Sequence, residues 1–323
     1  MRHVVTGGSG FTGTALIRML LDRGAEVVNF DLRPPDDPAI QRSAAFITGD
    51  VTNPADLTRL HFQPDDVVYH LAARQFADAV PRRGRDAWFH AVNVVGTRNV
   101  TAAMAVAGAR RLVFFSTDMT YGRPETCPVP VHHSQRPLGP YGRTKVAAEQ
   151  IIRTTPGLQA TIFRPRLITG PGRLGILGKL FRLIRRGLPV PMIGAGGNRY
   201  QMVGVDDCAR AALLAVDADC PNATFNLGSA APPTTRELLR GIIDHAGSRS
   251  VLLPISARLL KPLLAALDRM GLTLLYPEQF GIADIDILLD TMDTRQALGW
   301  RPLRSDLEMM IAAYDAFVAS SPS

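Results

Sequence analysis

Two residues near the middle of the chain could exchange a proton with a bound substrate. The stretch "YGRTK" places Tyr141 and Lys145 four residues apart, directly after Pro140. Residues at this spacing share one face of a helix, so the phenol and the ammonium can point into the same site. A phenol has a pKa near 10, and a neighbouring cation stabilises the phenolate and lowers that pKa. We therefore predict that Tyr141 acts as an acid–base group on an alcohol or a ketone.

A hydroxyl group at the end of a predicted strand could orient that substrate. The run "RLVFFST" over 111–117 predicts a strand that ends in Ser116 and Thr117. Parallel sheets bind ligands at the carboxyl ends of their strands. Thr117 can therefore donate to, or accept from, a substrate oxygen and aim it at Tyr141. Ser116 is less well placed for this role.

A glycine-rich turn near the start of the chain has the pattern of a dinucleotide-binding loop. The stretch "TGGSGFTG" lies between a short apolar run and a helical pattern. Gly7 permits a tight turn, Gly10 lets the backbone approach a pyrophosphate, and Gly13 lets the helix pack close to the sheet. The helix N-terminus then offers free N–H groups and the positive end of its dipole to phosphate.

An acidic residue at the end of the second predicted strand bears on which dinucleotide binds. Asp31 can accept hydrogen bonds from the ribose 2′- and 3′-hydroxyls and would repel a 2′-phosphate. Arg33 weakens that preference without reversing it. The sequence therefore favours NAD over NADP. Lys145 could hold the nicotinamide ribose, and an oxidised nicotinamide would further stabilise the Tyr141 phenolate.

The elements that must position these residues alternate between strands and helices. Apolar, β-branched runs predict strands at 3–6, 25–31, 44–50, 66–73, 111–117 and 160–165. Helical patterns lie between most of them, at 12–23, 54–61, 86–107 and 141–154. This alternation predicts an α/β fold of the Rossmann type, a doubly wound parallel sheet.

The alternation of strands and helices becomes less regular after residue 165, where glycine and proline become frequent. Mostly helical segments follow from residue 235. We predict an NAD-binding domain over 1–165, with a return of roughly 198–227. A smaller, mostly helical substrate-binding domain would then comprise 166–197 and 228–323.

Composition argues against several other classes of protein. The net charge is +7, but the basic residues are scattered and form no run of five or more, so we do not expect nucleic-acid binding. The three cysteines have no metal-like spacing and indicate a reducing compartment, so we predict no metal site. No secretory signal precedes the first strand, and no uninterrupted apolar stretch reaches the ~18 residues of a membrane span. We expect a cytoplasmic protein.

The nearest candidate for a span is the segment 259–276, which carries Lys261, Asp268 and Arg269. These charges predict an amphipathic helix instead. Two roles stay open for it. It could be a lid over an apolar substrate, or a helix that faces the core and a dimer partner, which we favour.

Together these motifs resemble the extended short-chain dehydrogenase/reductases, the NAD-dependent epimerase/dehydratase family. The family order is matched by "TGGSGFTG", Asp31, "HLAA", "NVVGT", "STDMTYG", "YGRTK" and "RPRLITGPG", and "GAGGNRYQMVGVDDCARA", "FNLGS" and "LGWRP" extend the likeness over essentially the whole chain. The resemblance implies NAD as cofactor, a catalytic set of Thr117, Tyr141 and Lys145, and often a homodimer formed through a helix pair. It also implies a cofactor site lined by Gly7, Gly10, Phe11, Thr12, Gly13, Asp31, Arg33, Asp50, Val51, Leu71, Ala72, Ala73, Tyr141 and Lys145.

Departures from the family patterns concern the substrate. Sugar-nucleotide dehydratases resemble "STDEVYG", and Met119 stands where they have a glutamate base, so dehydration by that route is not expected. Asp118 could still assist proton transfer. Leu167 stands where many epimerases have an Asn that contacts the substrate diphosphate. Tyr200 stands where many have an Arg, although Arg199 is adjacent and could compensate. The residues predicted to contact the substrate are Asp118, Met119, Arg166, Arg199 and Tyr200.

The resemblance leaves two reactions open. In the first, which we favour slightly on family frequency, the protein epimerises a secondary alcohol of a nucleotide sugar through a transient ketone. The arginines that could clamp the diphosphate are Arg166, Arg173, Arg182, Arg185, Arg186 and Arg199. In the second, the same residues serve an NAD(P)-dependent dehydrogenase or ketoreductase on a non-nucleotide alcohol, as in the 3β-hydroxysteroid dehydrogenase branch. A non-catalytic NAD-binding scaffold is a third interpretation, against which the Tyr141/Lys145 pair argues.

Overall fold

The central feature of the fold is a seven-stranded sheet in the order β10-β6-β5-β4-β1-β2-β3, seen in a computed structural model that describes residues 1–172, 175 and 177–320. Every pairing in this sheet is parallel. Its strands are β1 (Arg2–Thr6), β2 (Glu26–Asp31), β3 (Ala45–Thr48), β4 (Val67–His70), β5 (Arg111–Phe115), β6 (Gln159–Pro165) and β10 (Thr224–Leu227). The predicted Rossmann-type architecture is thereby confirmed.

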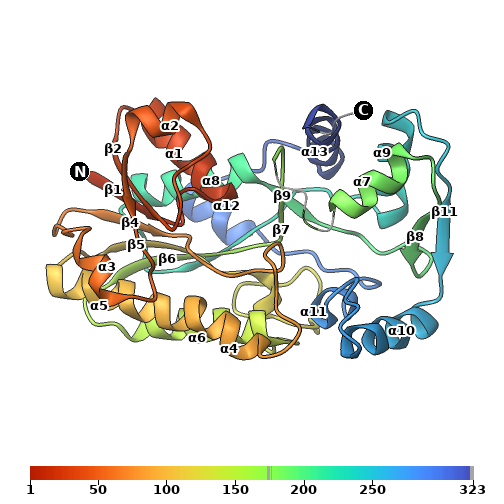
Figure 1. Ribbon diagram of the computed structural model, residues 1–323, viewed down its shortest axis with the longest axis horizontal. Helices are drawn as coiled ribbons and strands as arrows, with labels where there is room; N and C mark the ends of the chain where they lie inside the picture. The colour runs from red at the N-terminus through yellow and green to blue at the C-terminus, as the bar shows by residue number, and fades with distance from the viewer. Residues whose placement is uncertain (173–174, 176, 321–323) are drawn as a thin grey trace.

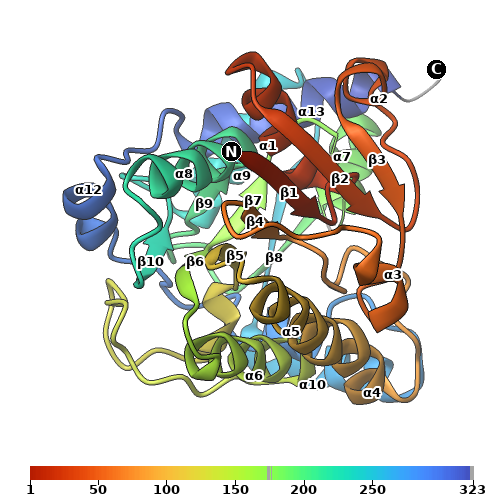
Figure 2. The same ribbon diagram turned by 90° about the vertical axis from the view of Figure 1, so that its left-hand side faces the viewer.

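Helices cover both faces of the sheet. Figure 1 shows α1 and α8 on one face and α5 and α6 on the other, and Figure 2 shows the same layers from the side. The helices around the sheet are α1 (Phe11–Asp22), α2 (Pro38–Ser43), α3 (Pro54–Thr58), α4 (Arg85–His90), α5 (Thr97–Ala107), α6 (Pro140–Thr154), α8 (Val205–Asp217) and α12 (Met292–Leu298).

The core lies on both sides of the sheet because side chains alternate along each strand. On β1, Val5 packs in a cluster with Leu16 of α1. Its neighbour Val4 packs in the opposite cluster with Met104 of α5 and Ile152 of α6. This double burial fixes the strand ends, and with them the loops that carry the predicted site.

The chain leaves the sheet after β6 and builds a second group of elements at the other end of the molecule (Figure 1). They are β7 (Leu167–Thr169), α7 (Leu177–Arg185), β8 (Val190–Ile193), β9 (Met202–Gly204), α9 (Thr235–His245), β11 (Leu252–Ile255), α10 (Ala257–Arg269), α11 (Pro277–Phe280) and α13 (Asp306–Ser320). Their own apolar cluster includes Phe181, Ile242 and Phe317. The exact division into two domains stays a prediction.

The helix predicted over 86–107 is interrupted. Residues Ala91–Gly96 form a π-helical turn between α4 and α5. Gly96 lies within it, and a Cβ there would come within 2.7 Å of Val51 Cγ2. The Thr97 hydroxyl donates to the Asn93 carbonyl. The local pattern of apolar residues does not distinguish such a turn from a regular helix.

The predicted amphipathic segment 259–276 forms α10, which ends at Arg269. Of its residues only Leu264 is buried, whereas Leu259 is 74% exposed and Leu263 is 54% exposed. The prediction that this helix faces the core is therefore wrong. No helix in the described ranges has the length and apolarity needed to cross a membrane.

Candidate active site

The glycine loop between β1 and α1 has the geometry of a phosphate cradle. Gly7 has φ +74°, and a Cβ there would lie 2.5 Å from the Ala72 backbone nitrogen. A Cβ at Gly13 would lie 2.5 Å from the Gly7 carbonyl oxygen. Gly10 caps α1 without any side-chain hydrogen bond to the first turn. No side-chain cap therefore stands at the start of this helix, where a pyrophosphate would accept hydrogen bonds from backbone N–H groups.

Asp31 at the end of β2 lies against this loop. Its carboxylate accepts a hydrogen bond of 3.0 Å from the Ser9 backbone N–H. The Ser9 hydroxyl in turn donates to the carbonyl of Arg33, whose side chain is exposed. Burial raises the pKa of the Asp31 carboxyl, and the N–H groups of neighbouring residues oppose that rise. The carboxylate is thus fixed where the ribose hydroxyls of a dinucleotide would reach it.

The remaining predicted cofactor residues follow the next two strands. Asp50 and Val51 come after β3, and Leu71, Ala72 and Ala73 come directly after β4. The Leu71 N–H donates to the Thr6 carbonyl, which ties this segment to the end of β1. Phe11 and Thr12 open α1. These residues all lie at the carboxyl edge of one sheet and fit the binding of an extended dinucleotide, although their individual contacts stay predictions.

Replacing Gly10 by alanine is expected to weaken NAD binding by about tenfold or more, which corresponds to ~1.4 kcal/mol. Among the described residues its Cβ would meet the Gly7 carbonyl oxygen at 3.1 Å, a close contact that a small shift of the loop would relieve. The methyl group would instead occupy the space through which the backbone approaches the pyrophosphate. Titration of NAD by calorimetry measures the loss.

Gly24→Ala is the matched control for this experiment. Gly24 lies just beyond the other end of α1 and has φ +70°, and no described atom lies within 4 Å of its Cβ position. Strain at this positive φ should lower the free energy of unfolding by about 1 kcal/mol and leave NAD affinity unchanged. Equal NAD affinity in the Gly10→Ala variant and the wild type would contradict the assignment of the loop.

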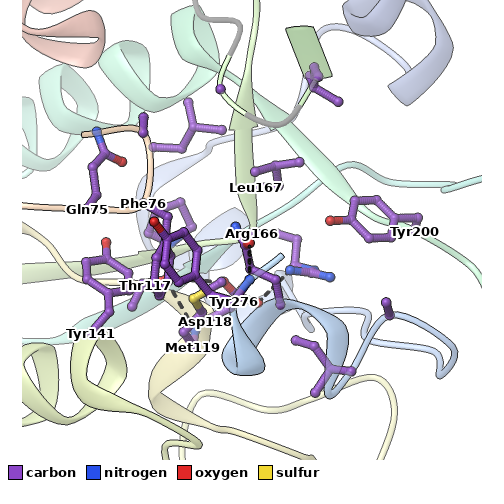
Figure 3. A pocket seen from close by; sticks show the side chains of 18 of the residues that line it. Gln75, Phe76, Thr117, Asp118, Met119, Tyr141, Arg166, Leu167, Tyr200 and Tyr276 are labelled. Carbon is purple, nitrogen blue, oxygen red and sulfur yellow. Dashed lines mark hydrogen bonds and ion pairs between the residues drawn. The ribbon is translucent and has the colours of Figure 1, made fainter. Parts of the chain in front are cut away.

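The predicted acid–base residues meet at a pocket of about 320 Å³. Tyr141 and Thr117 both line it, and Figure 3 shows them together with Asp118 and Met119. Tyr141 lies in the first turn of α6, and Thr117 is the second residue after β5. A Cβ on Gly142 would come within 2.6 Å of the Met119 carbonyl oxygen, so the glycine after Tyr141 allows α6 to approach the end of β5.

Lys145 lies one turn further along α6 and is buried. Its Nζ donates to the Phe115 carbonyl at 2.8 Å and lies 4.6 Å from the centre of the Phe114 ring. Burial lowers the pKa of the Lys145 ammonium to about 7, and Glu149 opposes that shift. Ribose hydroxyls of a bound dinucleotide would add hydrogen-bond partners for this amine.

The residues that follow Thr117 form a buried hydrogen-bonded network. The Thr117 hydroxyl donates to Asp118 at 3.2 Å and accepts from the Met119 N–H at 3.2 Å. Asp118 also accepts from Arg166 at 2.9 Å, an ion pair drawn in Figure 3. The Arg166 guanidinium lies 4.9 Å from the centre of the Tyr200 ring. Asp118 therefore acts in this structure as an anchor for Thr117 and Arg166.

The wall facing Tyr141 is aromatic and aliphatic. Phe76 stacks on Tyr276 with ring centres 4.6 Å apart, and its edge meets the Tyr141 ring at 5.4 Å. Leu167 lines the same pocket. The other apolar residues of the wall are Ile168, Leu177, Leu274 and Ile282. Phe76 and Tyr276 come from segments 200 residues apart, so sequence reasoning did not find this wall.

Several polar groups of the lining are already paired within the protein. The Ser116 hydroxyl donates to Glu149, and the Thr273 hydroxyl donates to Asp268. The Gln279 carbonyl oxygen accepts from the Tyr276 N–H. These groups therefore offer a substrate less hydrogen bonding than their chemical types suggest.

The predicted substrate arginines do not gather at this pocket. Arg166 lines it, but Arg199 forms an ion pair with Asp286 and lines a separate hollow. Tyr200, its neighbour, does line the pocket. Arg173 lies outside the described residues. Arg185 packs over the ring of Phe317, away from Tyr141.

A buried carboxylate that sequence reasoning missed holds the start of α6, the helix that carries Tyr141, in place. Glu278 of α11 accepts hydrogen bonds from the backbone N–H groups of Tyr141 at 3.0 Å and Gly142 at 3.1 Å. Burial raises the pKa of Glu278, and these two N–H groups oppose the rise. A carboxylate is favourable at a helix N-terminus. Its sequence neighbours gave no signal, because the contact exists only in the folded chain.

Comparison with known proteins agrees with this geometry. The model of the NAD dependent epimerase/dehydratase family matches residues 3–228. A 2-alkyl-3-oxoalkanoate reductase of Stenotrophomonas maltophilia is 32% identical over 78% of this chain and 77% of its own length. A UDP-glucose 4-epimerase of Mycolicibacterium smegmatis is 30% identical over 94% of each chain. The structure of the Thermus thermophilus UDP-glucose 4-epimerase in complex with NAD superposes with a TM-score of 0.78, at 26% identity, over 99% of this chain and 100% of the other.

The family model thus matches most of this chain. The same chain contains the glycine loop, the acid at the end of β2 and the pocket around Tyr141. The chain belongs to the NAD-dependent epimerase/dehydratase family and is an NAD-dependent enzyme of the extended short-chain dehydrogenase/reductase type.

Proposed function

We propose that the protein reversibly oxidises a secondary alcohol to a ketone, with Tyr141 as the acid–base residue and Thr117 as the group that orients the substrate oxygen. Bound NAD would supply the hydride acceptor or donor. The Tyr141 phenolate takes the hydroxyl proton during oxidation and returns it during reduction. The Thr117 hydroxyl donates to Asp118, so its oxygen remains able to accept from the substrate hydroxyl.

We further propose that the body of the substrate is apolar, which makes the enzyme a dehydrogenase or ketoreductase on a non-nucleotide alcohol. The observation that carries this proposal is the wall of Phe76, Tyr276 and Leu167 around Tyr141. Sugar hydroxyls buried against such a wall would lose their hydrogen bonds to water, at about 1–3 kcal/mol for each group left unpaired. An alkyl or ring substrate carries no such penalty.

Epimerisation of a nucleotide sugar is the second candidate. The similarity to the Mycolicibacterium smegmatis UDP-glucose 4-epimerase along 94% of each chain favours it. Two cationic residues in the described pocket could also meet a diphosphate. Arg166 has an Nε without a hydrogen-bond partner among the described residues, and Lys179 donates only weakly to the Leu274 carbonyl, at 3.4 Å.

The two reactions differ in whether they change the amount of free cofactor. Purified protein would be mixed with NAD and either apolar secondary alcohols, such as long-chain 3-hydroxy acids and 3β-hydroxysteroids, or UDP-hexoses. The proposal expects NADH to accumulate in step with ketone from the apolar alcohols. Interconversion of UDP-hexoses without net NADH, together with no reaction of the apolar alcohols, would replace the proposal by the second candidate.

Leu167→Asn tests the apolar wall directly. We expect kcat/KM for an apolar alcohol to fall about tenfold, because the amide would be left unpaired when the substrate covers it. Leu167→Ile is the matched control and should keep at least most of the activity, since it conserves volume and polarity. An asparagine variant with unchanged or higher kcat/KM for apolar alcohols would contradict the wall's role.

A further inference from the structure

The outward face of α10 is apolar, which is unusual for a surface helix. Leu259, Leu263 and Met270 are 74%, 54% and 64% exposed. With Ala266, which is also exposed, they follow the spacing i, i+4, i+7 and i+11, so they share one face. The helix α10 lies next to α11, at the end of the molecule opposite to β1 and β2 (Figure 1).

The apolar surface continues past the end of the helix to the mouth of the substrate pocket. Leu272 is 58% exposed and Leu274 is 56% exposed. Thr273, Leu274 and Tyr276 also line the pocket that contains Tyr141. We call Leu259, Leu263, Met270, Leu272 and Leu274 the apolar ridge.

The inward side of α10 carries Asp268 and Lys261, and each is paired with an opposite charge from another segment. Asp268 accepts two hydrogen bonds from Arg85, at 2.8 and 2.9 Å. Lys261 forms an ion pair with Asp284. Asp268 and Asp284 are thus paired with cations, which weakens their repulsion of an anionic partner of the ridge.

Four exposed arginines flank the ridge. Arg258 and Arg269 lie on α10, eleven positions apart and therefore on one edge of its exposed face. Arg82 and Arg83 lie in a loop beside the helix end, because a Cβ on Gly271 would be 3.0 Å from Arg82 Cδ. None of the four has a hydrogen bond or ion pair within the described part of the chain. The ridge is therefore bordered by uncompensated positive charge.

We propose that the apolar ridge and these four arginines dock on the surface of an anionic lipid bilayer, with α10 lying in the plane of the membrane. A helix with an apolar face and a basic border has the composition of an interfacial helix, and each arginine gains from anionic headgroups. A second copy of the chain fits less well. A two-fold interface centred on the ridge would bring the same arginines together from both subunits.

This docking would place the pocket mouth at the lipid interface, since Leu274 belongs to both the ridge and the pocket lining. A substrate with an apolar body could then reach Tyr141 from the bilayer without crossing water. The docking surface itself does not depend on which substrate the enzyme uses.

Co-sedimentation of the full chain, saturated with NAD, with vesicles tests the proposal. We expect binding to vesicles of phosphatidylcholine mixed with phosphatidylglycerol to be at least tenfold tighter than to phosphatidylcholine alone, and to weaken at high salt. Removing the arginines one by one, as Arg82→Ala, Arg83→Ala, Arg258→Ala and Arg269→Ala, should cost about fivefold each. The double variant Leu259→Glu/Leu263→Glu should lose binding by about tenfold or more.

Val106→Glu is the matched control, because Val106 is 92% exposed on α5, away from α10. It should bind vesicles like the wild type. Titration with NAD shows that each variant is folded. Equal binding to neutral and anionic vesicles, or no binding to either, would overturn the proposal. So would a substitution in the ridge that halves the mass of the protein measured by light scattering without lipid. The last result would show that a second copy covers the ridge.

Discussion

Replacing Tyr141 by phenylalanine is expected to lower kcat/KM by about 10²–10⁴-fold, the range for a lost acid–base group, while NAD binding stays nearly unchanged. The variant keeps the ring, which packs against Phe76 at 5.4 Å and Phe89 at 5.6 Å. Only the phenolic oxygen is removed from the pocket. Steady-state kinetics on the substrate found in the panel above, with calorimetric titration of NAD, separates chemistry from binding.

Tyr314→Phe is the control for the loss of a phenol elsewhere in the molecule. Tyr314 belongs to the apolar cluster around Phe181 and does not line the pocket. The Tyr314→Phe variant should therefore have the same kcat/KM as the wild type. Wild-type turnover in the Tyr141→Phe variant would remove the central step of the proposed reaction and would favour the scaffold interpretation.

Replacing Arg164 by methionine is expected to lower the free energy of unfolding by about 3–5 kcal/mol, the cost of breaking a buried ion pair by removing one partner. Arg164 donates to both carboxylate oxygens of Glu149, at 2.9 and 2.6 Å. The side chains are only 4% and 1% exposed. Arg164 also donates to the Tyr121 hydroxyl and the Val131 carbonyl. The variant would leave the Glu149 charge buried without this cation and would remove one donor from each of these two oxygens.

The cost of this substitution should depend on pH in a defined direction. Burial alone would raise the pKa of Glu149, but Arg164 and the Ser116 hydroxyl hold it below its usual value. In the wild type this stabilisation is present above the unfolded pKa of about 4.3 and is lost as the pH falls below it. Without Arg164, burial raises the pKa, so the variant is least stable at high pH and recovers as Glu149 takes up a proton. The difference from the wild type should therefore be larger at pH 8 than at pH 5.

Urea unfolding of both proteins across this pH range measures the effect. Arg153→Met is the matched control, because Arg153 also contacts Glu149, at 3.4 Å, but is 45% exposed. Exposed pairs contribute about 0–1 kcal/mol. If the Arg164 and Arg153 variants lose similar stability, the buried pair does not hold the end of β6 to α6 as the structure indicates.

Short-range patterns in the sequence determined the framework of this protein. The alternation of strands and helices predicted the doubly wound sheet, which the structure confirms. The glycines of the first turn predicted a bare backbone, and the φ of Gly7 and the crowding at Gly13 show why it is needed. These features were predictable because strand periodicity and glycine geometry depend on neighbouring residues alone.

The tertiary structure decided the surroundings of the site. Arg199 and Tyr200 are adjacent in sequence, yet Asp286 holds the arginine away from the pocket while the tyrosine lines it. Phe76 and Tyr276 form a wall only because two distant loops meet over α6. Such contacts depend on which segments the fold brings together, and no local pattern encodes them.

The segment 259–276 illustrates the same limit. Its periodicity correctly predicted a helix with an apolar face, since that follows from the spacing of its leucines. Whether the face points inward is settled by the partners that the rest of the fold supplies. Here the ion pairs of Lys261 and Asp268 hold the polar side inward and turn the leucines to the outside.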